Sequence, residues 1–362
     1  MHDPQPLSRP PRNGLRWALI AGAVVVAGGA FAYVGGWLTP HRLTAQRLVD
    51  ELQRNGGGVH PGYRRNHAKG VCVAGYFEGN GKASAYSTAS VFAVGRTPVV
   101  GRFAIPGGNP YAPDGSVPIR SLALRFNLPN GQQWRTGMNS MPVFPVATPQ
   151  AFYALQVAGE KDPATGKPDP ARLAAFFAAH PETAAFRAWA KTAKPSASFV
   201  TESYSGIDAF YFIDAKGQRH AVRWQMVADA ANGTPAPAGD DNYLIPDLQH
   251  RLATGPQRWH LLVTLAHPGD PTDDATKAWP ADRTTLDAGT LVLTSEQPQD
   301  SGPCRDINYD PTVLPAGIAI SDDPLLSARS AAYADSYLRR TREEAHVPGT
   351  TAPTRTQPEA AR

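Results

Sequence analysis

Hydrophobic positions form two different patterns near the start of the chain. Residues 17–38 are uncharged and almost continuously apolar, and a helix of this length can span a bilayer. The next apolar positions, Leu48, Val49 and Leu52, have the spacing of one helix face, and Thr44 before them is a suitable N-cap. The pattern therefore predicts a membrane-type helix followed by a short amphipathic helix.

The spacing changes again in the remainder of the chain. From 71 to about 144, short apolar stretches alternate with Gly, Pro, Asn and Asp, which is typical of antiparallel strands and hairpins. Helical spacing returns between 169 and 194, strand patterns follow with a hairpin that turns at 216–217, and a last helix is expected over about 324–344. The predicted fold class is α+β, with an antiparallel barrel or sandwich and peripheral helices.

The composition supports a folded, turn-rich domain and argues against nucleic-acid binding. The 362 residues are 42% hydrophobic and include 35 prolines and 33 glycines, so the chain can bury a core and joins its strands by many turns. The formal net charge of +4 is spread along the chain, without the clustered Lys/Arg stripe that nucleic-acid binding requires. We therefore expect no nucleic-acid partner.

The N-terminus predicts export. Arginines within residues 1–16 precede the apolar segment, and positive residues on that side favour a cytoplasmic N-terminus. Residues 1–16 are then a cytoplasmic segment, 17–38 a single-pass transmembrane anchor in the bacterial inner membrane, and the remainder lies on the periplasmic side. A cleaved signal peptide is the alternative, because Ala-Phe-Ala at 30–32 has the pattern of a cleavage site. Both alternatives export the remainder.

Two further features concern the exported part. Residues 39–345 are the expected folded domain, whereas the tail 346–362 has too few apolar residues to fold and is expected to be disordered. Cys72 and Cys304 are the two cysteines, and an oxidising compartment permits them to pair. Two buried free thiols explain them equally well, because the sequence does not place their Cα atoms within bonding range.

A series of motifs shares its order and spacing with one known family. "RRNHAKG" continues into the strand "VCVAGYF", and "GRFAIPGG" (101–108), "IRSLALRF" (119–126) and "GMNSMPVF" (137–144) follow. The series ends in "DPTVLPAGIAISDDPLLSARSAAYADSYLRR" (310–340). Together these motifs resemble the monofunctional haem catalases over about residues 45–342. The longer N-terminal arm and C-terminal helical region of full-size catalases are missing, so the chain is most similar to the small catalase-related peroxidases.

The resemblance implies a catalase-like barrel that binds haem b, with a distal histidine and asparagine above the iron. His67 matches the histidine that moves a proton between the two peroxide oxygens, and Asn139 matches the amide that hydrogen-bonds the peroxide. Taken alone, a histidine in a basic run is more often a surface residue. The ordered motifs decide against that interpretation for His67, whereas Arg65 and Lys69 are expected to be solvent-exposed.

The resemblance also assigns the iron ligand and the residues that hold the haem. Tyr333 matches the ligand, and Arg329, four residues earlier on the same helix face, is expected to keep its phenolic oxygen anionic. Arg64, Arg102 and Arg340 match the positions that pair with haem propionates, because a planar guanidinium suits a carboxylate. Two aromatic residues are candidates to pack on the haem face or, equally, are ordinary core residues: Phe144 and Phe152.

The chain also departs from the family pattern. Ala104 stands where the family has a serine that hydrogen-bonds the distal histidine, so proton transfer is expected to be slower. An extra residue falls within 139–142, which could shift the asparagine, and Ser-Tyr at 336–337 replaces the Thr-His of full-size catalases. These changes are expected to open the pocket and to relax the preference for hydrogen peroxide as the second reductant.

The predicted function follows from the resemblance and its departures. It is a haem peroxidase that reduces hydrogen peroxide, with organic hydroperoxides as a second candidate substrate, through an oxyferryl intermediate. A small organic electron donor is the expected reductant, with weak catalase activity; the oligomeric state is left open. One alternative is a haem lyase or isomerase of lipid hydroperoxides. The other is an exported barrel that binds haem without catalysis.

Overall fold

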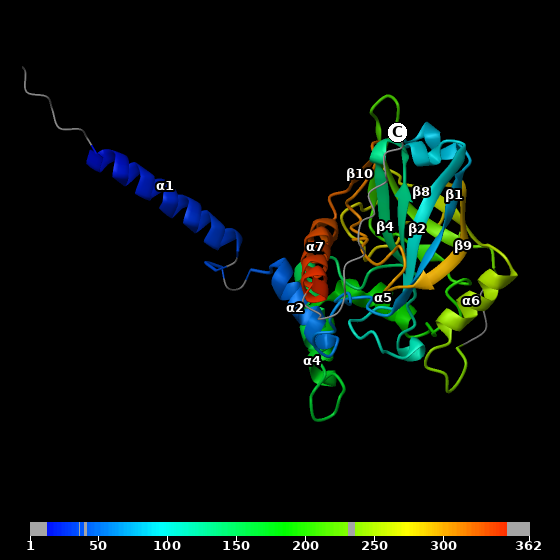
Figure 1. The fold of residues 1–362 in the computed structure, drawn as a ribbon, viewed down its shortest axis with the longest axis horizontal. Coiled ribbons are helices and arrows are strands. Elements are labelled where there is room, and N and C mark those ends of the chain that lie inside the picture. The colour runs from blue at the N-terminus through cyan, green and yellow to red at the C-terminus, as the bar shows by residue number, and fades with distance from the viewer. Residues whose placement is uncertain (1–12, 36, 40–41, 231–235, 346–362) are drawn as a thin grey trace, which may run out of the picture. The chain divides into compact units, whose positions relative to one another are not determined.

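The computed structural model describes residues 13–35, 37–39, 42–230 and 236–345 (Figure 1). The chain divides into two compact units, Met1–Thr44 and Ala45–Arg362. The tail 346–362 and the first part of the predicted cytoplasmic segment lie outside the described residues.

The first unit contains one long apolar helix. Helix α1, Asn13–Val34, buries none of its residues, and its length and composition are sufficient to cross a membrane. It begins before the predicted segment 17–38 and ends four residues earlier than expected. A signal sequence has the same properties, so the anchor and the cleaved peptide remain the two interpretations of α1.

The second unit is built around a closed antiparallel barrel. Eight strands pair in the ring order β1-β2-β3-β4-β5-β7-β8-β9, and β9 pairs with β1 to close it. Strands β6 and β10 extend from β7 outside the ring. The strands are β1 Gly70–Gly79, β2 Gly95–Ala104, β3 Ser121–Asn127, β4 Gln133–Asn139, β5 Tyr204–Ser205, β6 Phe210–Ile213, β7 Arg219–Ala228, β8 Gln257–Leu265, β9 Thr285–Pro298 and β10 Ile318–Ile320. The predicted barrel is therefore confirmed, and the sandwich is excluded.

Aromatic side chains fill the inside of the barrel. Successive residues of a strand point to opposite faces, and on β3 the inward Leu122, Leu124 and Phe126 are completely buried. Phe126 stacks on Trp134 of β4 with ring centroids 4.6 Å apart. Because this interior is packed, any ligand site on these strands has to lie on their outer face.

Helices cover that outer face. In Figure 1, α2 (Ala45–Asn55) and α7 (Pro324–Ala345) lie side by side against the barrel, and α3 (Pro149–Ala158) contacts both. The other helices are α4 Pro170–Ala179, α5 Ala184–Ala190 and α6 Leu244–Thr254. The predicted helices over 169–194 and 324–344 are thus present. Thr148 is the N-cap of α3, and its side chain accepts a hydrogen bond from the Ala151 amide.

A disulfide fastens a loop beside these helices to the barrel. Cys72 on β1 is bonded to Cys304, with their Cα atoms 5.3 Å apart, which decides the question that the sequence left open. The carbonyl oxygens of Cys304 and Ile307 each accept a hydrogen bond from Arg64 Nη2 at 3.0 Å. The disulfide therefore fixes the loop that holds the Arg64 side chain.

We expect loss of this disulfide to destabilise the second unit. Replacing both partners, Cys72→Ala with Cys304→Ala, removes a cross-link between residues 232 positions apart, and such a loss costs about 2–5 kcal/mol of unfolding free energy. Urea unfolding with and without a thiol reductant measures it. Reductant should lower the wild-type midpoint and leave the double variant unchanged; an equal midpoint for both proteins without reductant would contradict the prediction.

Candidate active site

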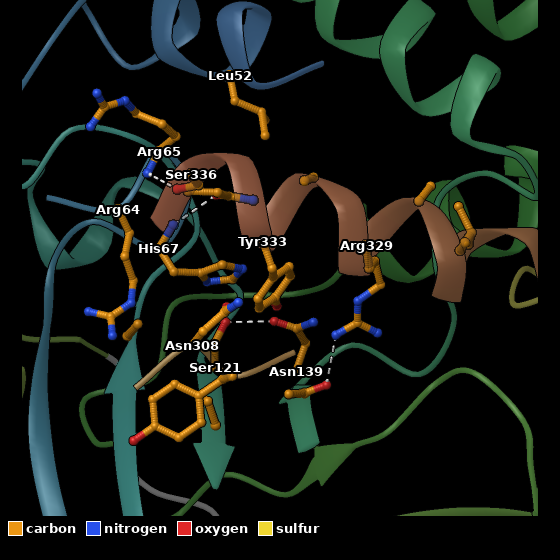
Figure 2. Close-up of a pocket in the computed structure, with 18 of the residues that line it drawn as sticks. Leu52, Arg64, Arg65, His67, Ser121, Asn139, Asn308, Arg329, Tyr333 and Ser336 are labelled. Carbon is orange, nitrogen blue, oxygen red and sulfur yellow. Dashed lines mark hydrogen bonds between the residues drawn. The ribbon is translucent and has the colours of Figure 1, made fainter. Parts of the chain in front are cut away.

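One pocket collects all the predicted site residues. It lies between the outer face of β2, β3 and β4, helices α2, α3 and α7, and the loop that follows Cys304 (Figure 2). Its lining includes every residue that the sequence singled out as catalytic, cofactor-binding or metal-ligating: Arg64, His67, Arg102, Asn139, Phe144, Phe152, Arg329, Tyr333 and Arg340. The pocket thus brings together segments from both ends of the second unit.

The turn that carries His67 has a strained backbone. His67 has φ of +55°, a left-handed conformation that costs free energy for a residue with a side chain. The Asn66 side chain stabilises it, because its Oδ1 accepts hydrogen bonds from the backbone N–H of His67 at 2.9 Å and of Gly107 at 2.8 Å. Asn66 was not predicted from the sequence. It ties the turn to the segment that follows β2.

The His67 imidazole is held in its neutral form. Burial, followed by the positive charges of Arg102, Arg329 and Arg64, lowers its pKa to about 3. Its Nδ1 atom is buried and has no hydrogen-bond partner among the described residues, as expected from Ala104 in place of the family's serine. A neutral imidazole has a free nitrogen lone pair, so the ring is able to accept a proton.

Asn139 lies at the end of β4 with its side chain in the pocket. Despite the extra residue expected after it, Asn139 keeps its register with Ser121 of β3. The Ser121 hydroxyl donates a hydrogen bond to Asn139 Oδ1 at 2.6 Å, shown as a dashed line in Figure 2. Ser121 is a pocket residue that the sequence argument missed, because only the pairing of β3 with β4 places it beside Asn139.

Tyr333 and Arg329 form the opposite side of the pocket on α7. Both approach Gly137: a Cβ atom at that position would lie 3.2 Å from Arg329 Nη2 and 3.5 Å from the Tyr333 hydroxyl. Arg329 Nη2 donates to the Gly137 carbonyl at 3.3 Å, and Nη1 pairs with the Asp208 carboxylate. Gly137 therefore leaves the room that this close approach requires.

Asp208 fixes the charge of Arg329. Burial alone would lower the pKa of Arg329, but Asp208 and then Tyr333 raise it above its ordinary value. Burial also raises the pKa of Asp208, which the neighbouring Arg329 opposes. Asp208 precedes β6 in a loop without periodic pattern, so no sequence signal connected it to α7.

Three further arginines create a cationic corner. Arg64 and Arg102 form no ion pair with a carboxylate in the described part of the chain, and Arg340 has only Glu344 at 4.0 Å. Burial and then Arg340 lower the pKa of Arg64 to about 10; burial and then Arg64 lower that of Arg102. Burial and mutual repulsion therefore both disfavour the positive charge of Arg64 and Arg102.

Neighbouring basic residues have different surroundings. Arg339 pairs with Asp335 at 2.7 Å and with Asp50 at 2.5 Å, so of the arginines near the end of α7, Arg340 is the one that lines the pocket. The expectation that Arg65 and Lys69 are solvent-exposed is wrong. Arg65 is 4% exposed and pairs with Glu343, and Lys69 pairs with Asp114 at 2.8 Å. These two ion pairs connect the His67 turn to neighbouring segments.

The two predicted phenylalanines pack together at the α3 side of the pocket. The ring centroids of Phe144 and Phe152 are 5.7 Å apart, with the planes tilted by 32°. The Phe144 amide donates to the Ala275 carbonyl at 2.9 Å, which holds the strand-like segment after β4 in place. Both rings are half-buried and add an apolar wall to the pocket.

The barrel, its covering helices and the pocket on its outer face define the class of protein. A solved structure titled "Structure of a bacterial catalase" superimposes with a TM-score of 0.68 and 23% identity, over 77% of this chain and 57% of that chain. The chain has the catalase fold.

Sequence comparison identifies the family. The Catalase family model matches residues 40–356, and the chain belongs to this family. A catalase-related peroxidase of Synechococcus elongatus is 40% identical over 331 residues, which cover 90% of this chain and 97% of that protein. A catalase-related peroxidase of Mycolicibacterium paratuberculosis is 31% identical, over 83% of this chain and 95% of its own length. The chain is therefore similar to these relatives over nearly their whole length.

The lowered pKa of His67 predicts a defined pH dependence of stability. Between pH 7 and pH 5 the unfolded chain, with an ordinary histidine pKa near 6.5, takes up a proton that the folded state does not bind. Folding stability is therefore lost as the pH falls through that range, by about 2 kcal/mol at pH 5. Urea unfolding of the protein without added ligand measures this loss.

Two variants separate this effect from others. His67→Gln should lose about 2 kcal/mol less than the wild type between pH 7 and pH 5, because glutamine does not titrate. The same change at His250, an exposed residue of α6, controls for the removal of a histidine. Identical losses for wild type and His67→Gln would refute the assignment of a buried neutral imidazole.

Proposed function

We propose that this protein is a haem b-dependent peroxidase that reduces hydrogen peroxide with small organic electron donors, with disproportionation of peroxide as a weak second activity. Membership of the catalase family supports an oxidoreductase that acts on peroxide and a haem-type cofactor. The observation that carries the proposal is the convergence of His67 and Asn139 on one side of a single pocket with Tyr333 and Arg329 on the other.

The cationic corner fits the carboxylates of a haem. Arg102 and Arg340 are buried, Arg64 is half-buried, and neither Arg64 nor Arg102 forms an ion pair with a carboxylate among the described residues. Two propionate groups would supply the missing negative charge, and guanidinium groups suit them because they pair bidentately. Phe144 and Phe152 would contact the apolar macrocycle, and the orphaned His67 Nδ1 marks the polar distal side.

Tyr333 is the proposed iron ligand. Tyrosine is one of the axial ligands that haem proteins use, and a phenolate needs a positive neighbour to remain charged in a buried site. Arg329 supplies that charge and is itself neutralised by Asp208. Asp208 therefore positions Arg329. Together, Asp208 and Arg329 determine the charge that surrounds the Tyr333 hydroxyl.

The chain's own residues provide the acid–base chemistry. When bound, haem supplies an iron centre that exchanges electrons with peroxide and donor. His67, neutral at physiological pH, would accept a proton from one peroxide oxygen and return it to the other. When the O–O bond breaks, this second oxygen would leave as water with the electron pair of that bond, and electrons from the organic donor would reduce the oxygen that remains. The Asn139 amide donates a hydrogen bond that orients the peroxide. Ala104 gives the imidazole no hydrogen-bond partner, which supports a preference for organic donors over a second peroxide.

The proposed location is the periplasmic side of the inner membrane. Helix α1 supports either a retained anchor or an export signal, and both place the second unit outside the cytoplasm. The Cys72–Cys304 disulfide supports the same placement, because disulfides persist in oxidising compartments and are rare in the cytosol.

An absorption spectrum with and without peroxide tests the proposed function. Purified protein loaded with haem should bind one haem per chain, change its spectrum on addition of peroxide, and oxidise an organic dye. Tyr333→Phe should lose the tyrosinate-type spectrum and at least about 100-fold of the dye-oxidising rate, because the axial ligand sets the electronics of the iron.

The same measurements distinguish the alternatives. Conversion of a lipid hydroperoxide without any electron donor would favour a lyase or isomerase, and haem binding without a response to peroxide would favour a non-catalytic haem carrier. Either result would overturn the peroxidase proposal. An unchanged spectrum in Tyr333→Phe would remove the ligand assignment.

Adding a hydroxyl at position 104 should shift the balance between the two activities. Ala104→Ser restores to the pocket the hydroxyl that the family pattern pairs with the distal histidine, and His67 Nδ1 has no hydrogen-bond partner among the described residues. One such bond is worth about 1 kcal/mol, or about fivefold in rate, so oxygen release from peroxide should rise about fivefold relative to dye oxidation. In Ala104→Ser with His67→Gln the increase should vanish. A ratio that stays constant in Ala104→Ser would show that the missing hydroxyl does not limit the reaction.

A further inference from the structure

Three adjacent strands place one residue each in a row across the floor of the pocket. Ala104 of β2 pairs with Ser121 of β3, and Ser121 pairs with Asn139 of β4. All three side chains lie on the outer face of the barrel and line the pocket. Ser121 is the member of this row that carries a hydroxyl. Its neighbour Ala104 has no polar side-chain atom, so the hydrogen bond within the row goes to Asn139.

The hydroxyl is committed to Asn139. Ser121 Oγ donates to Asn139 Oδ1 at 2.6 Å, whereas His67 Nδ1 has no partner in the described part of the chain. Because Ser121 is only 7% exposed, water has little access to this bond. The Ser121 hydroxyl therefore hydrogen-bonds the Asn139 carbonyl oxygen and not the His67 imidazole.

This bond selects one of two orientations of the amide. A carboxamide can rotate by half a turn, which exchanges its N–H₂ donor and its carbonyl acceptor. With Oδ1 held by Ser121, Nδ2 is directed to the other side, as Figure 2 shows. Nδ2 makes no hydrogen bond within the described residues, so it is free to donate to a molecule in the pocket.

We propose that Ser121 is a positioning residue that holds the Asn139 amide with its N–H₂ group toward the peroxide. The inference rests on the proposed function and deepens it. Without the hydroxyl, the amide would also present its carbonyl oxygen to the peroxide, and the hydrogen bond to the bound molecule would be lost for part of the population. Ser121 thus controls peroxide binding, whereas the proton transfer remains with His67.

Cyanide binding to the haem-loaded protein provides a test that does not depend on turnover. Bound cyanide accepts a hydrogen bond on the distal side, so Ser121→Ala should raise the cyanide Kd about fivefold, the equivalent of one hydrogen bond. In an Asn139→Ala background the same substitution should have no effect, because Ser121 acts through the amide. For peroxide, Ser121→Ala should raise KM more than it lowers kcat.

Ser205→Ala is the matched control. Ser205 pairs with Asn139 from the other neighbouring strand, β5, but its hydroxyl accepts a hydrogen bond from Gln225 Nε2 at 3.2 Å and the residue lies outside the pocket lining. It should leave the cyanide Kd unchanged. If Ser121→Ala does not fold, Ser121→Cys, with a weaker donor of similar size, should give a smaller increase in Kd.

The outcomes separate this inference from the function on which it rests. A wild-type protein that binds no haem overturns the proposed function and the inference with it. A haem-loaded wild type that responds to peroxide, with an unchanged Kd in Ser121→Ala, overturns the inference alone. An equal increase with and without Asn139 would assign Ser121 a merely structural role and would also overturn it.

Discussion

The strands that build the barrel core also build the site, and the alternation of their side chains governs both. On β3, Leu122 and Phe126 face inward and are completely buried, whereas Ser121 faces the pocket. A one-residue shift in pairing would exchange these faces. The aromatic packing of the interior, with Phe126 stacked on Trp134, therefore fixes the register of the outer row as well. Stability of the core and placement of the polar groups are consequences of one pairing pattern.

Charge balance is organised differently on the two sides of the pocket. On the α7 side, Arg329 pairs with a protein carboxylate, Asp208, and also lies close to the Tyr333 hydroxyl. At the cationic corner, Arg64 and Arg102 are supported by carbonyl and amide oxygens, which solvate the charges without neutralising them. A buried cation without a counter-charge is costly. The unpaired guanidinium groups line a pocket, where an anionic ligand would remove this cost.

A site residue could be predicted from the sequence when it belonged to a contiguous motif, but not when its role depended on a contact with another segment. His67, Asn139 and Tyr333 lie within contiguous motifs, so their segments could be recognised and all three line the pocket. Ser121 and Asp208 contact residues outside their own segments, 18 and 121 positions away in the chain, and only strand register or loop position reveals these contacts. The burial of Arg65 was missed for the same reason: its partner, Glu343, is more than 270 residues away. Pairing of the two cysteines likewise required their distance in space.

The left-handed backbone at His67 also restricts how this site can change over time. A β-branched residue fits that conformation poorly, while glycine, asparagine and aspartate enter it with less strain. Single substitutions that preserve the turn therefore bring in glycine, asparagine or aspartate and remove the imidazole in one step. Gradual drift through bulkier apolar residues would disturb the Asn66 bridge to Gly107 as well. Loss of the imidazole in this lineage should consequently be abrupt, with a well-folded barrel left behind.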